Sequence, residues 1–496
     1  MAVPGHAEML QTHTAVLFFL GDRVYKLKKP VDLGFLDFRQ RTDRSRVCHR
    51  EIQLNRRLAP DVYLGVADVL GPDGEPCDHL VVMRRMPADR RLSTLVRRPA
   101  PIAADLRRLA RMLAAFHARA RRGPTIDIEG SRAALQDRWD ATFTQLRRFH
   151  GGVLDALDAA EVEDRTHEFL AGRDRLFTER IGHGHIVDGH GDLIADDIFL
   201  LDDGPRVLDC LEFDDRLRYL DVLDDVAFLT MDLEHLGAPA LAHDFLAGYL
   251  EFSGDPAPEA LVHHYSAYRA FVRAKVACLR HEQGDPDAAV DVADYTDLTL
   301  RHLRAGAVRL VLVGGTPATG KSTLAGRLAD RLGATVLSSD RIRKELAGID
   351  PGTGAADYRT GIYTAEWTER TYAEMMWRAR RLLEHGETVI LDASWTSERR
   401  RGCARSLATC AHSDLTELRC TAEPATLADR LAARVPGGYS DADARIAALL
   451  ARDADDWPQA HEIRTDTTVD AIAQALAAVG PYRQLSTAGG PVHQPG

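Results

Sequence analysis

Apolar and polar positions over the first 100 residues fall into short apolar runs that turn residues separate. Residues 15–20 and 79–83 are two such runs, and residues 71–74 (GPDG) form one of the turns. This pattern predicts a small antiparallel sheet. A helical pattern over residues 44–58 interrupts the sheet and ends just before a proline.

From about residue 100 to residue 304 the apolar positions recur at helical spacing, so we expect mainly helices there. Residues 105–122 show this spacing, with apolar side chains three or four residues apart on one face. Two short strands, at residues 186–187 and 206–208, lie within this helical part, and its last helix covers residues 290–304.

The last part of the chain alternates apolar strands with helices. The predicted strands cover residues 308–313, 335–337, 388–391, 417–420 and 462–464. Such alternation predicts a parallel sheet with helices on both faces. We therefore expect a chain of mixed α/β and α+β class with two domains, residues 1–304 and 305–480, and a disordered Gly/Pro/Ser-rich tail at 481–496.

Composition and charge narrow the class of protein. No apolar run reaches the about 18 residues of a membrane span, and no signal peptide pattern begins the chain. The seven cysteines form no CxxC pair, which is typical of thiols in a reducing cytoplasm. The net charge of −11 argues against a nucleic-acid partner. We expect a cytoplasmic protein that does not bind membranes.

Residues 315–322 read GTPATGKS and directly follow the first predicted strand of the last part. Two glycines, then a lysine and a hydroxyl residue, form the phosphate-binding loop pattern. The glycines let backbone N–H groups converge on phosphate oxygens, and the next helix directs the positive end of its dipole to the same anion. Lys321 is expected to reach the β- and γ-phosphates of ATP, and Ser322 to help hold Mg²⁺. The expected nucleotide-binding residues are Gly315, Thr316, Pro317, Ala318, Thr319, Gly320, Lys321, Ser322 and Thr323.

Two acids follow at strand ends of the same predicted sheet. Asp340 comes just past the second strand, where a carboxylate can accept the proton of an attacking hydroxyl. It could instead cap the following helix. Asp392 ends the third strand, and we expect it to steady Mg²⁺ through water. Arg343, on the first helical turn after Asp340, could neutralise an anionic substrate.

Arg430 and Arg434 lie in a charged segment that residues 436–438 (PGG) interrupt. Glycine joints beside charged helices suit a lid that closes over phosphates. Both arginines could equally be solvated surface residues.

This last part resembles the P-loop small-molecule kinases, a group that includes polynucleotide 5′-hydroxyl kinases, gluconate-type kinases and zeta-type toxins. The resemblance rests on residues 315–323, the SxDxxR pattern at 338–343, the strand that ends in an acid, and the lid arginines. It implies that Asp340 is the general base and that Arg343 and Arg430 contact the substrate. Lys321 and Arg434 would act on the transferred phosphoryl group. An ATPase without an acceptor is the alternative.

Lysines are rare, because arginine fills most basic positions. The few lysines are therefore enriched where a compact, mobile charge is needed. Three of them crowd into residues 24–29, which indicates a second phosphate site unless this is a solvated edge strand. The lysines of the chain are Lys26, Lys28, Lys29, Lys275, Lys321 and Lys344.

Residues 190–197 read HGDLIADD, and an apolar strand then leads to Val207-Leu208-Asp209. This pattern resembles the catalytic centre of the aminoglycoside and choline phosphotransferases, which share the bilobal protein-kinase fold. The resemblance implies that Asp192 is the catalytic base and that Asp209 holds Mg²⁺. The second metal ligand would be Asp197, where the family has Asn. Taken without the family pattern, the HGD motif could be a simple turn between two strands.

The resemblance also implies the rest of the nucleotide site. Lys26, favoured over Lys28, would grip the α- and β-phosphates, and Glu51 would pair with it. Residues 79–86 would be the hinge between lobes, and residues 11–14 would cover the phosphates. Acidic residues between 214 and 225 could cap helices, shape a cleft for a cationic ligand or form a solvated face.

These observations support three hypotheses. The first is a bifunctional ATP-dependent phosphotransferase with Mg²⁺ and a small-molecule hydroxyl substrate. The second makes the first domain a pseudokinase that regulates the P-loop kinase, because of Asp197 and the missing glycine-rich loop. The third, a polynucleotide 5′-hydroxyl kinase, needs a basic groove that the near-neutral last part does not favour.

Overall fold

The computed structural model describes residues 8–12, 14–32, 37–98, 100–349, 361–433 and 444–480, except for the side chains of 444–447. The chain divides into two compact units. The first consists of Met1–Arg148, Glu179–Pro256 and Tyr265–Leu298, and the second of Phe149–Thr178, Ala257–His264 and Thr299–Gly496. Within the described ranges, no helix is long and apolar enough to cross a membrane.

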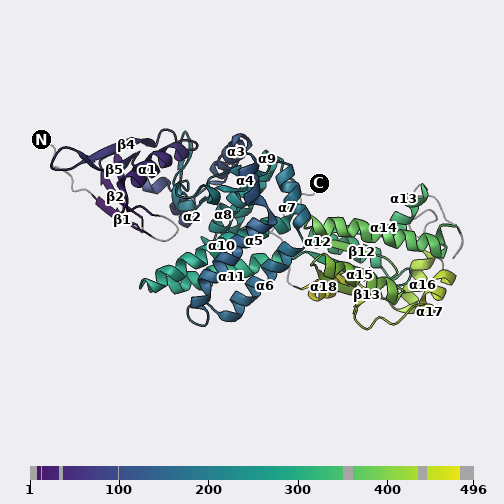
Figure 1. The fold of residues 1–496 in the computed structure, drawn as a ribbon. Coiled ribbons are helices and arrows are strands. Elements are labelled where there is room, and N and C mark those ends of the chain that lie inside the picture. The colour runs from purple at the N-terminus through teal and green to yellow at the C-terminus, as the bar shows by residue number, and fades with distance from the viewer. Residues whose placement is uncertain are drawn as a thin grey trace. The chain divides into compact units, whose positions relative to one another are not determined.

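A five-stranded antiparallel sheet begins the first unit, with the strand order β1-β2-β3-β5-β4. The strands are β1 (Glu8–Gln11), β2 (Ala15–Leu20), β3 (Arg23–Lys28), β4 (Tyr63–Leu70) and β5 (Pro76–Arg84). Helix α1 (Arg41–Asn55) packs against it, and Cys48 and Ile52 join Val24, Tyr63 and Val81 in a buried apolar cluster. The sheet and α1 are purple in Figure 1.

Helices and two short hairpins follow this sheet. The helices are α2 (Leu92–Arg97), α3 (Ala103–Arg119), α4 (Pro124–Asp127), α5 (Arg132–Leu146), α6 (Ala156–Ala171), α7 (Asp174–Gly182), α8 (Val222–His235), α9 (Pro239–Ser253), α10 (Glu259–Glu282) and α11 (Ala288–Ala305). Strand β6 (Ile186–Asp188) pairs with β9 (Tyr219–Asp221), and β7 (Ile198–Leu201) pairs with β8 (Gly204–Val207). Helix α8 is buried from Val222 to Leu233 and packs against α9, which also packs against α3.

A parallel five-stranded sheet forms the centre of the second unit, in the order β11-β12-β10-β13-β14. Its strands are β10 (Arg309–Gly314), β11 (Thr335–Ser338), β12 (Val389–Asp392), β13 (Asp414–Thr421) and β14 (His461–Arg464). The later helices are α12 (Lys321–Leu332), α13 (Ser339–Ala347), α14 (Ala365–Glu384), α15 (Glu398–Cys410), α16 (Pro424–Ala432), α17 (Ala444–Arg452) and α18 (Thr468–Val479).

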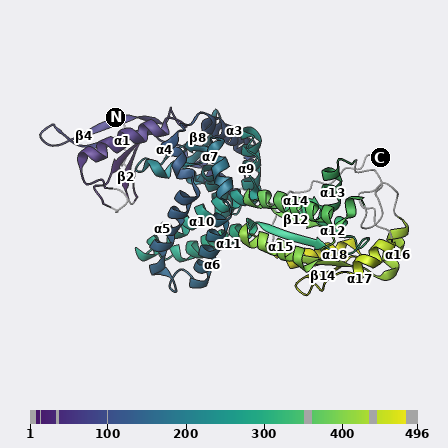
Figure 2. The same ribbon diagram turned by 45° about the vertical axis from the view of Figure 1, so that its right-hand side comes forward.

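Helices cover both faces of this parallel sheet (Figure 2). Val311 and Val313 of β10 pack into an apolar cluster with α12 and α18. The alternate side chains Leu310 and Leu312 are also fully buried, on the side where α14 and α15 pack together. A strand buried on both faces needs a continuous apolar run, which is why residues 308–313 are so apolar.

Earlier segments of the chain belong to the same compact unit as the parallel sheet, among them residues 149–178. Arg173 in this segment is 1% exposed and donates hydrogen bonds to the carbonyls of Ala411 (2.7 Å) and His412 (3.1 Å). These carbonyls follow the C-terminus of α15, where helix carbonyls carry partial negative charge. The buried guanidinium is therefore compensated by backbone carbonyls.

The predicted fold class is confirmed, including an antiparallel sheet, a helical part and a covered parallel sheet. Two boundaries were wrong. Helix α1 covers Arg41–Asn55 rather than 44–58, because the N–H of Arg57 bonds the carbonyl of Leu54 and tightens the backbone after Asn55. The expected hinge at residues 79–86 is mostly strand, because β5 continues to Arg84 between β3 and β4.

Candidate active sites

The phosphate-binding loop joins β10 to α12 and contains three residues in left-handed backbone conformations. These are Gly315 (φ 145°), Ala318 (φ 69°) and Gly320 (φ 79°). A Cβ atom on Gly315 would lie 2.8 Å from the carbonyl oxygen of Cys420, so no side chain fits there. The glycines thus allow the loop to turn its N–H groups inward beneath the N-terminus of α12.

Asp392, at the end of β12, lies beside the first residues of α12. It interacts electrostatically with Lys321 and Asp340, and with the hydroxyls of Ser322 and Ser338. Burial raises the pKa of the Asp392 carboxyl, and Lys321 opposes this increase. One carboxylate oxygen, Oδ1, is buried and makes no hydrogen bond. The parallel sheet therefore brings the predicted lysine, hydroxyl and two acids of the P-loop site together.

A cavity of about 440 Å³ opens beside the phosphate-binding loop. Arg430 lines it and donates to the carbonyls of Ala318 (3.3 Å) and Thr465 (2.6 Å). The Thr465 hydroxyl donates to the carbonyl of Thr319 at 2.6 Å. Arg430 thus contacts the nucleotide-binding loop in this structure. The second predicted lid arginine, Arg434, lies outside the described residues.

Arg343 of α13 contacts the protein itself. Its Nη1 donates to the carbonyl of Ile362 (3.0 Å) and to Thr368 (3.2 Å), and its guanidinium lies over the Tyr363 ring. The side chain is 6% exposed, and its Nε makes no hydrogen bond. The expected substrate contact by Arg343 stays a prediction. Asp340 lies in the first turn of α13, whose N-cap is Ser338, so Asp340 is not the capping residue.

In the first unit, two lysines of β3 meet acids at the sheet face that α1 covers. Lys26 Nζ lies 3.0 Å from Glu51 and 2.6 Å from Asp209. Burial alone would lower the pKa of Lys26, but Asp209 and Glu51 raise it well above its usual value. Lys28 binds Glu51 (2.6 Å) and Glu212. Lys26 is thus the lysine that reaches the predicted metal ligand, while the fully buried Glu51 contacts both lysines.

Residues 189–193, between β6 and β7, form the loop that carries the HGD motif. The carboxylate of Asp225, in α8, accepts the N–H groups of His190 (2.7 Å) and Gly191 (2.9 Å) and contacts His117 Nε2 (3.1 Å). Burial alone would raise the pKa of Asp225, but these partners hold it well below its usual range. Asp225 therefore fixes the backbone directly before Asp192.

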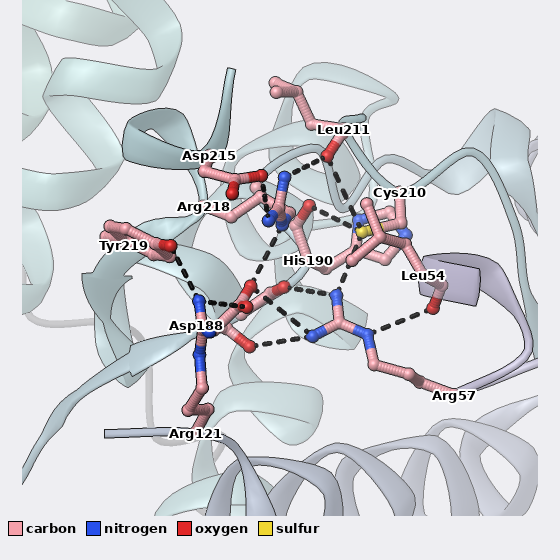
Figure 3. Close-up of polar contacts among 12 residues, drawn as sticks. Leu54, Arg57, Arg121, Asp188, His190, Cys210, Leu211, Asp215, Arg218 and Tyr219 are labelled. Carbon is pink, nitrogen blue, oxygen red and sulfur yellow. Dashed lines mark hydrogen bonds and ion pairs between the residues drawn. The ribbon is translucent and has the colours of Figure 1, made fainter. Parts of the chain in front are cut away.

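Two arginines tie this loop to the strand end that bears Asp209 (Figure 3). Arg57 donates to the carbonyl of Asp188 (2.9 Å) and to Cys210 Sγ (3.1 Å). Arg218 donates to the Asp188 carboxylate (2.9 Å) and to the carbonyl of Leu211 (2.8 Å). Four short contacts of two arginines thus set the spacing between the HGD loop and residues 209–211.

Three carboxylates gather at this point, and their charges interact. Burial raises the pKa of Asp192 to about 6, and Asp209 adds to the rise. Burial, Asp209 and Asp192 raise the pKa of Asp197 well above its usual value. Asp209 has a left-handed backbone (φ 61°), which the hydroxyl of Tyr63 supports by accepting its N–H at 3.1 Å. Strained conformations of this kind concentrate at functional sites.

This carboxylate set fits Mg²⁺, which prefers oxygen ligands and takes only one or two carboxylates besides phosphate and water. The side chain of Asp209 is 44% exposed and so accessible to a cation. Asp197 and Asp209 would hold the ion, and Asp392 with Ser322 would hold one in the P-loop site. Among the residues described, no group of three or more His, Cys, Asp or Glu side chains is arranged as a metal site.

Comparisons with known proteins agree with this two-part architecture. A family described as "AAA domain" matches residues 310–454. Uncharacterized proteins of Mycobacterium tuberculosis and Mycobacterium bovis are 46% identical to the chain over 461 residues, 92% of each chain. The chain belongs to the family of these mycobacterial proteins. The matched AAA domain contains the phosphate-binding loop and Asp392, and it lies within the part of the chain that forms the parallel sheet.

Two solved structures show similarity to one part of the chain each. A choline/ethanolamine kinase family protein from Mesorhizobium loti is 16% identical and covers 60% of this chain and 91% of its own, with a TM-score of 0.39. A kinase from Chloroflexus aurantiacus, described as putative, is 23% identical and covers 32% of this chain and 89% of its own, with a TM-score of 0.26.

Several residues that shape these sites were not predicted from the sequence. Glu212 binds Lys28, Asp225 holds the HGD loop, and Thr465 holds Arg430 against the phosphate-binding loop. The signal for Asp225 was present in the acidic run between residues 214 and 225, but its partners lie far away in the sequence. Nothing in the local pattern distinguishes Thr465 from an ordinary loop threonine.

Proposed function

We propose that the chain is a bifunctional phosphotransferase, with one site in residues 1–304 and another in residues 305–480. Each site moves the γ-phosphoryl group of ATP to a hydroxyl of a small molecule. The observation that carries the proposal is that each half places a lysine near one acid, with a second acid close to the first. The first set consists of Lys26, Asp209 and Asp192. The second set consists of Lys321, Asp392 and Asp340.

In the first site, Lys26 binds the phosphates of ATP once nucleotide displaces it from Asp209. Asp192 accepts the proton of the acceptor hydroxyl as that oxygen attacks the γ-phosphorus. Mg²⁺ on Asp209 and Asp197 would neutralise phosphate charge. The raised pKa of Asp192 suits a base that must release its proton again after transfer.

In the second site, backbone N–H groups of the phosphate-binding loop cradle the phosphates, except at Pro317, which has none, and Lys321 neutralises their charge. Asp340 accepts the hydroxyl proton, and Asp392 with Ser322 would hold the metal ion. Arg430 is placed to contact the nucleotide, while Arg343 and Arg434 are proposed as substrate and lid residues.

The test is ADP release by the full-length protein with Mg²⁺-ATP across sugars, amino alcohols, nucleosides and oligonucleotides. Lys321→Ala and Asp192→Ala are assayed in parallel. The proposal expects each variant to lose turnover of a different acceptor. Loss of all turnover in Lys321→Ala with none lost in Asp192→Ala would refute the bifunctional assignment.

One observation favours a second candidate, in which the first domain is a pseudokinase that regulates the P-loop kinase. Asp197 stands beside Asp192 and Asp209, and burial together with these two charges raises its pKa well above the usual value. A protonated Asp197 is a weaker metal ligand than an ionised one. Nucleotide binding without turnover in the first site would support this candidate.

A further inference from the structure

The acidic residues around the first site are already engaged within the protein. Asp224 binds Arg269 at 2.7 Å, and Asp232 accepts the N–H of Ala195 at 2.7 Å. Asp196 accepts a hydrogen bond from the Ser93 hydroxyl. These carboxylates therefore hold residues 195–196 and helix α10 in place. The expected cleft for a cationic ligand gains no support from them.

Arg273 in α10 differs from these residues. One turn earlier on the same face, Arg269 donates to the carbonyl of Gly191 at 3.1 Å, so this face of α10 lies against the catalytic loop. Arg273 accordingly interacts electrostatically with Asp192 and Asp232. In the part of the chain that the structure describes, it forms no ion pair with a carboxylate, and its buried Nε makes no hydrogen bond.

An aromatic pair supports this arginine from one side. The guanidinium carbon of Arg273 lies 5.8 Å from the centroid of the Tyr295 ring, which belongs to α11. Tyr295 is stacked on His235, at the end of α8, with 4.0 Å between ring centroids. Figure 2 shows α10 and α11 running next to each other. The side chain is thus held in place without being neutralised by a carboxylate.

The guanidinium hydrogen-bonds Tyr295 and interacts with the charges of Asp192 and Asp232 without forming an ion pair to either. A partly desolvated charge of this kind is stabilised further when a ligand supplies a directly paired anion. Its planar fork of five donors matches a carboxylate or a phosphate, to which it can form two parallel hydrogen bonds. A cationic acceptor such as an aminated sugar would be repelled at this position. Recognition of an oxyanion next to the reacting hydroxyl accounts for an arginine that faces Asp192 without an ion pair to a carboxylate of the described residues.

We propose that Arg273 binds an anionic group of the acceptor, so that the first site phosphorylates a hydroxyl of a small carboxylate- or phosphate-bearing molecule. The inference rests on the proposed function of the Asp192 site. The same oxyanion chemistry could instead come from the γ-phosphate of ATP, and the experiment separates these two sources.

The test measures binding of sulfate, as an oxyanion probe, to the full-length Lys321→Ala protein by calorimetry at constant ionic strength. Saturating Mg²⁺ and a non-hydrolysable ATP analogue fill the nucleotide sites. Arg273→Met is expected to weaken sulfate binding at least about tenfold, the cost of a lost bidentate ion pair, and Arg273→Lys to weaken it less. Arg280→Met, on the same helix but paired with Asp285 and Asp291, is the control and should bind sulfate normally.

Two results overturn the inference: sulfate binding that is unchanged in Arg273→Met, or sulfate binding seen with ADP but abolished by the ATP analogue. The second result assigns Arg273 to the γ-phosphate. Arg273→Gln replaces Arg273→Met if the latter does not fold.

Turnover then tests the link to the proposed function. Glycerate and glucose 6-phosphate are compared with glycerol, glucose and ethanolamine as acceptors. We expect Asp192-dependent turnover only among the anionic compounds, with a KM that rises in Arg273→Lys. Sulfate binding that depends on Arg273, without any Asp192-dependent turnover, would leave the anion site standing and refute the kinase function of this domain. Turnover of the neutral or cationic compounds alone would refute the anionic preference.

Discussion

Replacing Asp225 by Asn should destabilise the catalytic loop of the first domain far more than an isosteric change normally does. One oxygen of Asp225 accepts from His190 and His117, and the other accepts from Gly191, in a site with no solvent exposure. An amide has only one acceptor oxygen. Its NH₂ group must therefore face a backbone N–H that loses its acceptor.

The magnitude follows from two contributions. Losing a hydrogen bond to a charged acceptor costs about 1.5–3 kcal/mol, and leaving a buried donor unsatisfied costs about 1–3 kcal/mol. We expect Asp225→Asn to lose about 2.5–6 kcal/mol of unfolding free energy, a large share of the about 5–15 kcal/mol of an ordinary domain.

The assay is native-state hydrogen exchange, which reports each region separately. Amide exchange of His190 and Gly191 should accelerate by at least about a hundredfold, since about 1.4 kcal/mol corresponds to a factor of ten. Amides of β10 should not change. Asp244→Asn, at an exposed position of α9, is the matched control. A change below about 1 kcal/mol at His190 would show that Asp225 does not hold the loop.

Three further predictions address both units. Lys26→Met should remove nucleotide binding at the first site alone, because Lys26 lies against Asp209. Lys29→Met is the control, since Lys29 donates to the backbone carbonyl of Thr12, and it should leave nucleotide binding unchanged. Equal effects of the two variants in nucleotide titrations would contradict the assignment. Gly320→Ala should weaken ATP binding at the second site about tenfold, because the φ angle of Gly320 is 79° and a non-glycine residue in this left-handed conformation costs about 1–2 kcal/mol. Calorimetry measures the affinity for ATP, and an unchanged affinity would argue against this loop conformation. Burial lowers the pKa of His263 and of His264 to about 3. The unfolded protein therefore binds more protons than the folded protein between about pH 3 and pH 6.5. As a result, the free energy of unfolding falls as the pH falls, by about 1.4 kcal/mol per pH unit for each histidine. Urea unfolding at pH 5 and pH 7 checks this, and His264→Phe should reduce the dependence.

The sequence predicted those parts of the site whose geometry is local. The phosphate-binding loop is contiguous, and its glycines, lysine and serine follow an apolar strand. Asp392 could be placed near Lys321 because parallel strands end at the same edge of a sheet. Lys26 could be placed on the face of Val24 because side chains alternate along a strand.

Long-range contacts could not be predicted in this way. Glu212 and Asp225 find partners that are more than 30 residues away, and such pairs depend on the packing of whole helices. The acidic run that contains Asp225 was expected to cap helices, to shape a cationic cleft or to form a solvated face. Asp214 and Asp221 are helix caps, but the contacts of Asp224 with Arg269 and of Asp225 with the HGD loop could not be predicted. The contacts of Arg343 with Ile362 and Thr368 depend on α14, whose position no local pattern fixes.

Because of Arg173, the C-terminal half of the chain is a poor candidate for moving to another protein by gene recombination on its own. A protein cut at residue 305 would keep the phosphate-binding loop, every strand of the parallel sheet and both of its helical layers. It would lose the guanidinium that satisfies the carbonyls of Ala411 and His412 after α15. Recombination that exchanges whole kinase modules between genes would therefore have to carry residues 149–178 with the sheet, although they lie more than 120 positions before it. Such interleaving helps to keep the two compact units on one polypeptide.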